Sequence, residues 1–225
     1  MESAALLRLL QISDSAFPTG SFSHSMALEA FSEAGELRGA DDLERVVGLY
    51  LSTLATSDCV ALRASYGVGL EELFRVDRLL TATKLARELR QASASTGKRF
   101  LLGVAALGVE GGTLGAFTEA VREGASPGNL AVGYGVVAPP LGLGVEETLR
   151  GYLYAGVAAL VAAGQKLVPL GGSVAQRVLF GLGEGVEGAA RISETVEVED
   201  MHAFAPTIDA RSMMHERQRT RLYIS

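Results

Sequence analysis

"GYLYAGVAALVAAG", residues 151–164, is the stretch that decides the fold of this 225-residue chain. Its residues are apolar or small on nearly every side of a helical projection, which is typical of a helix buried among other helices. Glu146, Glu147 and Arg150 precede it and Lys166 follows it, so the apolar run is shorter than the ~20 residues of a membrane-spanning helix. We therefore expect a central buried helix.

Amphipathic helical patterns lie on both sides of this stretch. Asp41, with Glu44 three residues later, is a candidate N-cap for the first of them. Apolar residues then recur at the spacing of one helical face in four segments: Leu43, Val46, Val47, Tyr50 and Leu54; Val76, Leu79, Ala82, Ala86 and Leu89; Leu114, Phe117 and Val121; Val174, Val178 and Leu182. The nearest strand candidate, "ETVEVED" at 194–200, is short and acidic. The sequence predicts an all-α fold, a single-domain helical bundle of about seven to ten helices.

Glycine positions add detail to this prediction. Gly35 and Gly124 fall where helices should end. Gly156 falls inside the central helix, where a missing side chain predicts close contact with another helix.

Composition excludes several classes of protein. Hydrophobic residues make up 48% of the chain and charged residues 20%, which excludes global disorder. A net charge of −6 argues against binding to nucleic acid or to an anionic membrane. A single cysteine allows no intrachain disulfide, and the first residues carry no secretory signal, so we expect a cytoplasmic protein.

The C-terminal region changes sign in charge. Residues 184–200 contain six acidic residues and one arginine, whereas residues 211–221 contain four arginines, Arg211, Arg217, Arg219 and Arg221, and one acidic residue. Such blocks occur on solvated faces and loose termini, and also in segments that order on binding. We divide the chain into an all-helical domain, 1–205, and a basic C-terminal docking tail, 206–225.

The N-terminal block "DSAFPTGSFSHSMALEAF", residues 14–31, concentrates polar and aromatic residues. A hydrolase would use Ser21, Ser23 or Ser25 with His24 and Asp14, but neighbouring residues on one turn rarely converge as a triad. The alternative is a structural turn and cap, in which Pro18 and Gly20 shape the turn and Ser21 and Ser23 cap a helix that Gly35 ends. This alternative leaves His24 and Phe22 without a task.

Metal, nucleotide and DNA sites have little support. The three histidines and one cysteine show no ligand spacing, so we predict no metal site. Gly97-Lys98 lacks the following Ser or Thr and the earlier glycine of a phosphate-binding loop. The basic block at the C-terminus lacks a preceding helix-turn-helix signature.

Four blocks in order resemble the UreF family of urease accessory proteins. They cover most of the chain: "LLQISDSAFPTGSFSHSMALEAF" at 9–31, "KLARELRQASASTGKRFLL" at 84–102, "LVPLGGSVAQRVL" at 167–179 and "DARSMMHERQRTRLYIS" at 209–225. The resemblance implies an all-helical, non-enzymatic homodimer that matures urease. It further implies that the chain bridges UreD (also called UreH) and the GTPase UreG on apo-urease, so that GTP hydrolysis is coupled to nickel delivery. No cofactor is then bound tightly, because nickel and GTP are handled by the partners.

The resemblance also carries site residues over to this chain. The surface that receives UreG is expected to contain Phe22, Glu29, Lys166 and Arg221. The surface that docks on UreD is expected to contain Met213, His215, Glu216, Arg217, Leu222 and Tyr223. The chain departs from the family pattern at Lys166, Gly172, Ala175, Met214 and the start of the segment at Asn129. These departures weaken the assignment of exact UreG contacts. They also argue against the handling of nickel by histidines of this chain.

Overall fold

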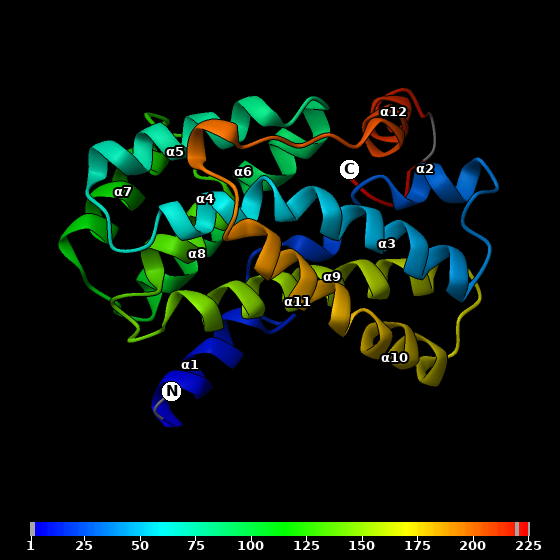
Figure 1. Cartoon of the computed structure of the whole chain (residues 1–225), viewed down its shortest axis with the longest axis horizontal. Coiled ribbons are helices and arrows are strands. Elements are labelled where there is room, and N and C mark those ends of the chain that lie inside the picture. Colours follow the sequence, from blue (N-terminus) through cyan, green and yellow to red (C-terminus); the bar gives the residue numbers. More distant parts are fainter. Residues whose placement is uncertain (1–2, 219–220, 225) are drawn as a thin grey trace.

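The computed structural model describes residues 3–218 and 221–224, and these residues form helices and connecting loops without a strand (Figure 1). The helices, in chain order, are α1 Ser3–Ser13, η1 Ser21–Ser23, α2 Leu28–Glu33, α3 Ala40–Ala55, α4 Asp58–Ala64, α5 Leu70–Thr83, α6 Arg87–Ala106, α7 Gly112–Glu123, α8 Leu130–Val137, α9 Val145–Leu167, α10 Gly172–Gly181, α11 Gly183–Ser193, η2 Val198–Asp200 and α12 Pro206–His215. Within the described ranges, ten α-helices have eight residues or more. The all-α prediction and the expected number of helices are confirmed.

The central helix is α9, which contains the apolar stretch 151–164. It packs against helices from both halves of the chain: α1, α2, α3, α4, α8, α10 and α11. Tyr152, Leu153, Val157 and Leu160 are buried on its covered faces. Tyr154 is exposed, so one face of α9 is left uncovered by the rest of the fold. No helix in the part of the chain that the structure describes is long and apolar enough to span a bilayer.

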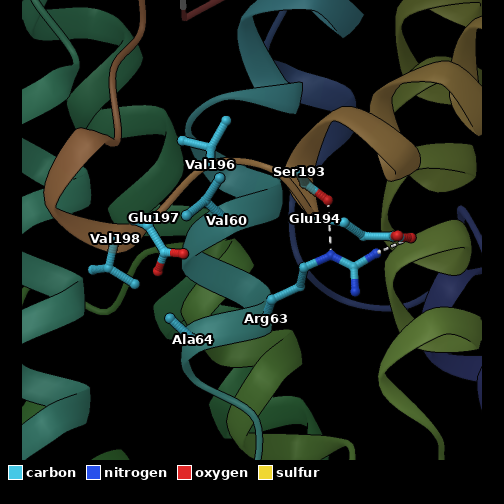
Figure 2. A pocket seen from close by; sticks show the side chains of 8 residues that line it. All are labelled: Val60, Arg63, Ala64, Ser193, Glu194, Val196, Glu197 and Val198. Carbon is cyan, nitrogen blue, oxygen red and sulfur yellow. Dashed lines mark hydrogen bonds and ion pairs between the residues drawn. The ribbon is translucent and has the colours of Figure 1, made fainter.

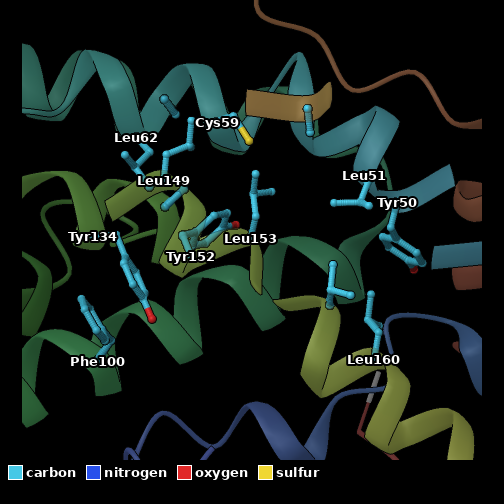
Figure 3. Close-up of a cluster of buried hydrophobic side chains, with 14 of the residues drawn as sticks. Tyr50, Leu51, Cys59, Leu62, Phe100, Tyr134, Leu149, Tyr152, Leu153 and Leu160 are labelled. Carbon is cyan, nitrogen blue, oxygen red and sulfur yellow. The ribbon is translucent and has the colours of Figure 1, made fainter. Parts of the chain in front are cut away.

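Aromatic rings connect α9 to α6 and α8 in the core (Figure 3). Phe100 stacks on Tyr134 with ring centroids 4.3 Å apart, and Tyr134 meets Tyr152 edge to face at 5.3 Å. The Tyr134 hydroxyl donates a 2.8 Å hydrogen bond to the carbonyl of Ile12, at the end of α1. The buried hydroxyl therefore has a partner, and it ties the N-terminal helix to the core.

Two of the predicted amphipathic segments form single helices as expected. The face of α3 is buried at Leu43, Val46, Val47 and Tyr50, and Leu114, Phe117 and Val121 are buried in α7. The pattern from Val76 to Leu89, however, is divided between two helices. α5 ends at Thr83 and α6 begins at Arg87, and the carbonyls of Lys84 and Leu85 in the break accept hydrogen bonds from Arg90.

Two local predictions are wrong. Asp41 does not cap α3, because the helix begins at Ala40 after Gly39 and has no side-chain cap. Residues 194–200, the nearest strand candidate, form a loop and η2, in agreement with the all-α prediction. A Cβ added to Gly156 would meet nothing within 4 Å, so this glycine permits no close helix contact.

We expect Gly156→Ala to raise the free energy of unfolding by about 0.5–1 kcal/mol, because alanine has the higher helix propensity and open space surrounds the site. Gly164 lies in the same helix and is the matched control, since its added Cβ would lie 2.6 Å from two methyl carbons of Leu43. Gly164→Ala should lose this gain through crowding. Urea unfolding followed by circular dichroism measures both, and equal effects at the two sites would contradict the packing difference.

A buried carboxylate joins α5 to α8. Asp77 accepts hydrogen bonds from the Ser126 hydroxyl (2.5 Å), the Gly128 N–H (2.7 Å), the Asn129 N–H (2.9 Å) and the Asn129 side-chain amide (2.7 Å). These donors lie just before α8, so Asp77 satisfies the start of a helix that is distant in sequence. Gly97 of α6 packs against the same turn, and a Cβ there would lie 2.0 Å from the Gly128 carbonyl oxygen.

Candidate functional site

The N-terminal block forms two turns before α2 begins. Residues 21–23 form η1, and Met26 and Ala27 adopt the left-handed region with φ of 51° and 69°. Neither η1 nor α2 has a side-chain cap, and the Ser21 hydroxyl instead contacts the Thr19 hydroxyl at 2.7 Å. The predicted caps at Ser21 and Ser23 are therefore wrong, because the chain must turn again before it can enter α2.

The other part of that prediction, a turn and a stop, is confirmed. Exposed Pro18 precedes Gly20, which takes a φ of 73° directly before η1, and an added Cβ there would lie 2.1 Å from a guanidinium nitrogen of Arg99. Gly35 takes a φ of 72° after α2, where the left-handed conformation ends the helix.

The C-terminal tail packs against this N-terminal block. After α12 the chain returns beside α2 (Figure 1), where the Glu29 carboxylate accepts the backbone N–H groups of Leu222 (2.8 Å) and Tyr223 (3.1 Å). The Ile224 N–H donates to the Ser23 carbonyl at 2.9 Å. The two ends of the chain therefore build one site.

His215, the last residue of α12, is fully buried between two carboxylates. Its Nε2 lies 3.1 Å from Glu29 and its Nδ1 lies 2.7 Å from Glu88 of α6. A neutral imidazole carries one N–H, so the two contacts together require a further proton, on the ring or on a carboxyl group. The three side chains join α2, α6 and α12 at one point.

Arg221 and Lys166 complete the arrangement around Tyr223. Arg221 donates to Glu88 at 2.8 Å, to the Gln218 carbonyl at 3.2 Å and to the Glu216 carbonyl. The Lys166 ammonium lies 5.8 Å from the centre of the Tyr223 ring. Tyr223 is buried and its hydroxyl lies 3.4 Å from the Ala163 carbonyl, so the tail is held against α9.

The residues expected to receive UreG come together in space. Phe22, Lys166 and Tyr223 line one cavity of about 460 Å³ that extends along α9. Glu29 binds the backbone beside Arg221, as described above. Phe22 is 73% exposed and Lys166 is exposed, whereas Glu29 is half-buried. Their contact with a partner stays a prediction.

The residues expected to dock on UreD have mixed environments. Met213, Arg217 and Leu222 are exposed, and Glu216 is half-buried and pairs with Arg87 at 3.1 Å. His215 and Tyr223 are buried against the chain's own helices, so in this structure they hold the tail in place. Arg219 of the basic block lies outside the described residues.

Two members of the alternative triad, Asp14 and Ser21, contact close neighbours in the N-terminal block. Asp14 is exposed, and its carboxylate accepts the N–H of Ala16 at 2.7 Å. Ser21 contacts Thr19, as noted above. In residues 3–218 and 221–224, no group of three or more His, Cys, Asp or Glu side chains could hold a metal ion.

Burial lowers the pKa of His24, Arg99 lowers it further, and Glu88 partly opposes both. A histidine whose folded pKa lies below its unfolded value of 6.5 stabilises the fold above that pH and loses this contribution as the pH falls. We therefore expect the unfolding free energy to fall between about pH 7 and about pH 5, and to fall less steeply in His24→Gln. Urea titrations at several pH values measure the slope, and identical slopes would contradict the assignment.

A separate hollow of about 370 Å³ lies between α4 and the loop after α11 (Figure 2). Arg63 borders it and donates to Ser193 at 2.8 Å, to Glu194 at 3.4 Å and to Glu146. The hydrogen bonds with Arg63 lower the pKa of Glu146. These bonds engage Arg63 within its own chain, and none of the predicted site residues lies at this hollow.

The sequence prediction missed Glu88 and Asp77. Glu88 is part of the Arg-Glu pair in the second resembling block, and this pair is the one signal that could have identified it. Nothing in the sequence around Asp77 distinguishes it from a surface carboxylate of an amphipathic helix, because its partners are about 50 residues away.

Comparisons with known proteins show the family of this chain. The UreF family model matches residues 37–183. The chain is 34% identical to the urease accessory protein UreF of Paenarthrobacter aurescens (strain TC1), over 100% of both chains. It is 35% identical to the same-named protein of Arthrobacter sp. (strain FB24), over 97% of this chain and 96% of that one, and 29% identical to that of Bacillus sp. (strain TB-90), over 98% and 99%. This chain therefore belongs to the UreF family of urease accessory proteins.

Proposed function

We propose that this chain is a urease maturation chaperone that bridges UreD (UreH) and the GTPase UreG on apo-urease, and so couples GTP hydrolysis to nickel delivery. The observation that carries the proposal is the assembly of one site from four distant parts of the sequence. Phe22, Lys166 and the tail residue Tyr223 line one cavity, and Glu29 binds the backbone next to Arg221. This site would receive UreG.

The chemistry of the site suits a protein partner. Phe22 is 73% exposed, and Lys166, which lines the same cavity, is exposed as well. Aromatic and aliphatic anchors with arginine or lysine nearby are the residues that contribute most to binding at protein interfaces. A firmly held tail adds to this, because a preordered surface loses less conformational entropy on binding.

The UreD surface is proposed to follow α12 and the tail, residues 206–225. Met213 and Met214 are exposed on α12, and Phe204 is exposed just before it. Methionine side chains are flexible and polarizable, which suits them to a protein interface. Exposed Arg217 would add charge-complementary contacts at the edge of the surface.

In this proposal the partner proteins carry out the chemical steps. UreG hydrolyses GTP, nickel and GTP are carried by partner proteins, and this chain modulates the GTPase through the surfaces it presents. We further propose that the chain works in the cytoplasm as a homodimer, which light scattering of the purified chain tests.

The proposal is tested by the order of binding. Purified chain should capture UreD alone, and should capture UreG only when UreD is present. In cells, deletion of this gene should leave urease without nickel, and the restored gene should return both nickel content and activity. Capture of neither partner by the folded chain would overturn the proposal.

Phe22→Ala is expected to weaken UreG capture by the complex with UreD about tenfold, while the melting temperature stays within a few degrees. The reason is that an exposed aromatic ring contributes little to the core but much to an interface. Phe180→Ala is the matched control, because Phe180 is exposed on α10 and does not line the cavity. A fall in melting temperature that accounts for the lost capture would show that Phe22 is structural.

A further inference from the structure

We propose that Glu88 is a positioning residue that holds the guanidinium of Arg221 in the arrangement that receives UreG. The inference rests on the proposed function and extends it to a residue outside the surface itself. Glu88 is only 6% exposed, so it acts through Arg221 and not by touching the partner.

The place of Glu88 in the fold is the start of a long core helix. It is the second residue of α6, a 20-residue helix, and lies in the first turn. The positive end of the helix dipole and the free N–H groups of that turn stabilise a negative charge there. The carboxyl group of Glu88 is therefore attached to the end of a rigid core helix.

The two oxygens of Glu88 divide between two parts of the C-terminal region. One lies 2.7 Å from Nδ1 of His215, at the end of α12, and the other accepts Nη1 of Arg221 at 2.8 Å. Glu88 also interacts electrostatically with His24, where its effect on the pKa opposes that of Arg99. Glu88 thus fixes Arg221 relative to α12 and to α6 at once.

The remaining hydrogen bonds of Arg221 cannot fix its guanidinium relative to α6. Its other acceptors among the described residues are the carbonyls of Gln218 and Glu216, which belong to the same tail and would move with it. Glu88 connects the guanidinium to the body of the protein. A guanidinium has five N–H groups, and three are used here, so others remain for an acceptor on a partner.

The test is a double-mutant cycle in the full chain bound to UreD, with UreG capture as the readout. Glu88→Gln keeps the shape but replaces one of the two carboxylate oxygens with an NH₂ donor, so it can no longer offer an oxygen to both His215 and Arg221, and capture should fall roughly tenfold. If Glu88 acts through Arg221, the double variant Glu88→Gln, Arg221→Ala should be no weaker than Arg221→Ala alone. Effects that multiply would overturn the inference.

Two further variants separate positioning from general stability. Glu36→Gln is the matched control, because Glu36 pairs with Arg211 of α12 and makes no contact with Arg221, and it should leave UreG capture unchanged. Arg221→Lys keeps the charge but loses the planar fork that reaches three acceptors. It should bind UreG as poorly as Arg221→Ala, and this variant decides the question if Glu88→Gln does not fold.

The outcomes also distinguish this inference from the function on which it rests. Unchanged capture in Arg221→Ala would remove Arg221 from the UreG surface and with it the proposed site. Lost capture in Arg221→Ala with full capture in Glu88→Gln or in Arg221→Lys would overturn only the positioning role.

Discussion

Replacing Asp77 by alanine is expected to lower the free energy of unfolding by about 4 kcal/mol, the largest loss of stability we predict for a single side chain. Asp77 is fully buried, and it is the acceptor for two backbone N–H groups, a hydroxyl and a side-chain amide. Alanine would leave all four donors without that acceptor. Each buried donor without a partner costs about 1–3 kcal/mol.

The position of these donors adds to the effect. Gly128 and Asn129 form the turn into α8, a short helix whose residues are almost all buried. Gly97 of α6 lies directly against this turn, so the backbone has little room to find other acceptors. Since a typical domain is stable by only about 5–15 kcal/mol, the variant should lie close to the limit of folding.

Urea unfolding followed by far-ultraviolet circular dichroism is the measurement, because the chain is helical and contains no tryptophan. Asp42→Ala is the control, since Asp42 is a partly exposed carboxylate that accepts the N–H of Arg38 at the surface. It should change the midpoint only slightly. Similar losses in the two variants would contradict the structural role of Asp77.

Helix positions and core faces could be predicted from the sequence because they depend on local periodicity. The face of α3 and the face of α7 are buried as their spacing indicates. The same reasoning failed between Val76 and Leu89, where one continuous pattern belongs to α5 and α6. The break is stabilised by Lys84, whose ammonium lies 2.5 Å from buried Asp58 of α4, a contact that periodicity does not record.

Helix starts could not be predicted, because serine and aspartate are common both in caps and in other turns. Ser21 and Ser23 lie in η1, and the chain passes through the left-handed conformations of Met26 and Ala27 before α2. Those two residues are not typical of that conformation. Contacts from the rest of the fold determine the turn, so the local sequence was misleading.

The site was predictable only in part. The resemblance brought Phe22, Glu29, Lys166 and Arg221 forward, but it gave no reason for them to meet. Their common feature is the tail. Its Tyr223 lies beside α9 and donates its backbone N–H to Glu29. His215 was expected at a partner surface and is instead buried between carboxylates of α2 and α6.

Arg221→Ala is expected to weaken UreG capture by roughly a hundredfold while the core stays folded. The side chain is 30% exposed and its acceptors are Glu88 and two tail carbonyls, so its loss removes one contact between the tail and α6 without opening the core. Tyr223 would keep its hydrogen bonds to Glu29 of α2 and to the Ala163 carbonyl of α9. The melting temperature should therefore change by only a few degrees.

UreD capture separates the two surfaces in this variant. If α12 and the exposed methionines form the UreD surface, Arg221→Ala should capture UreD normally and fail only at the second step. Arg177→Ala is the control for loss of a positive charge, because Arg177 is exposed on α10, outside the cavity. Loss of UreD and UreG together would mean that Arg221 supports the fold of the whole tail. Full UreG capture would mean that the GTPase does not bind at the cavity beside Tyr223. The reason is that, in the described residues, Arg221 is the one cation that the tail contributes next to Tyr223.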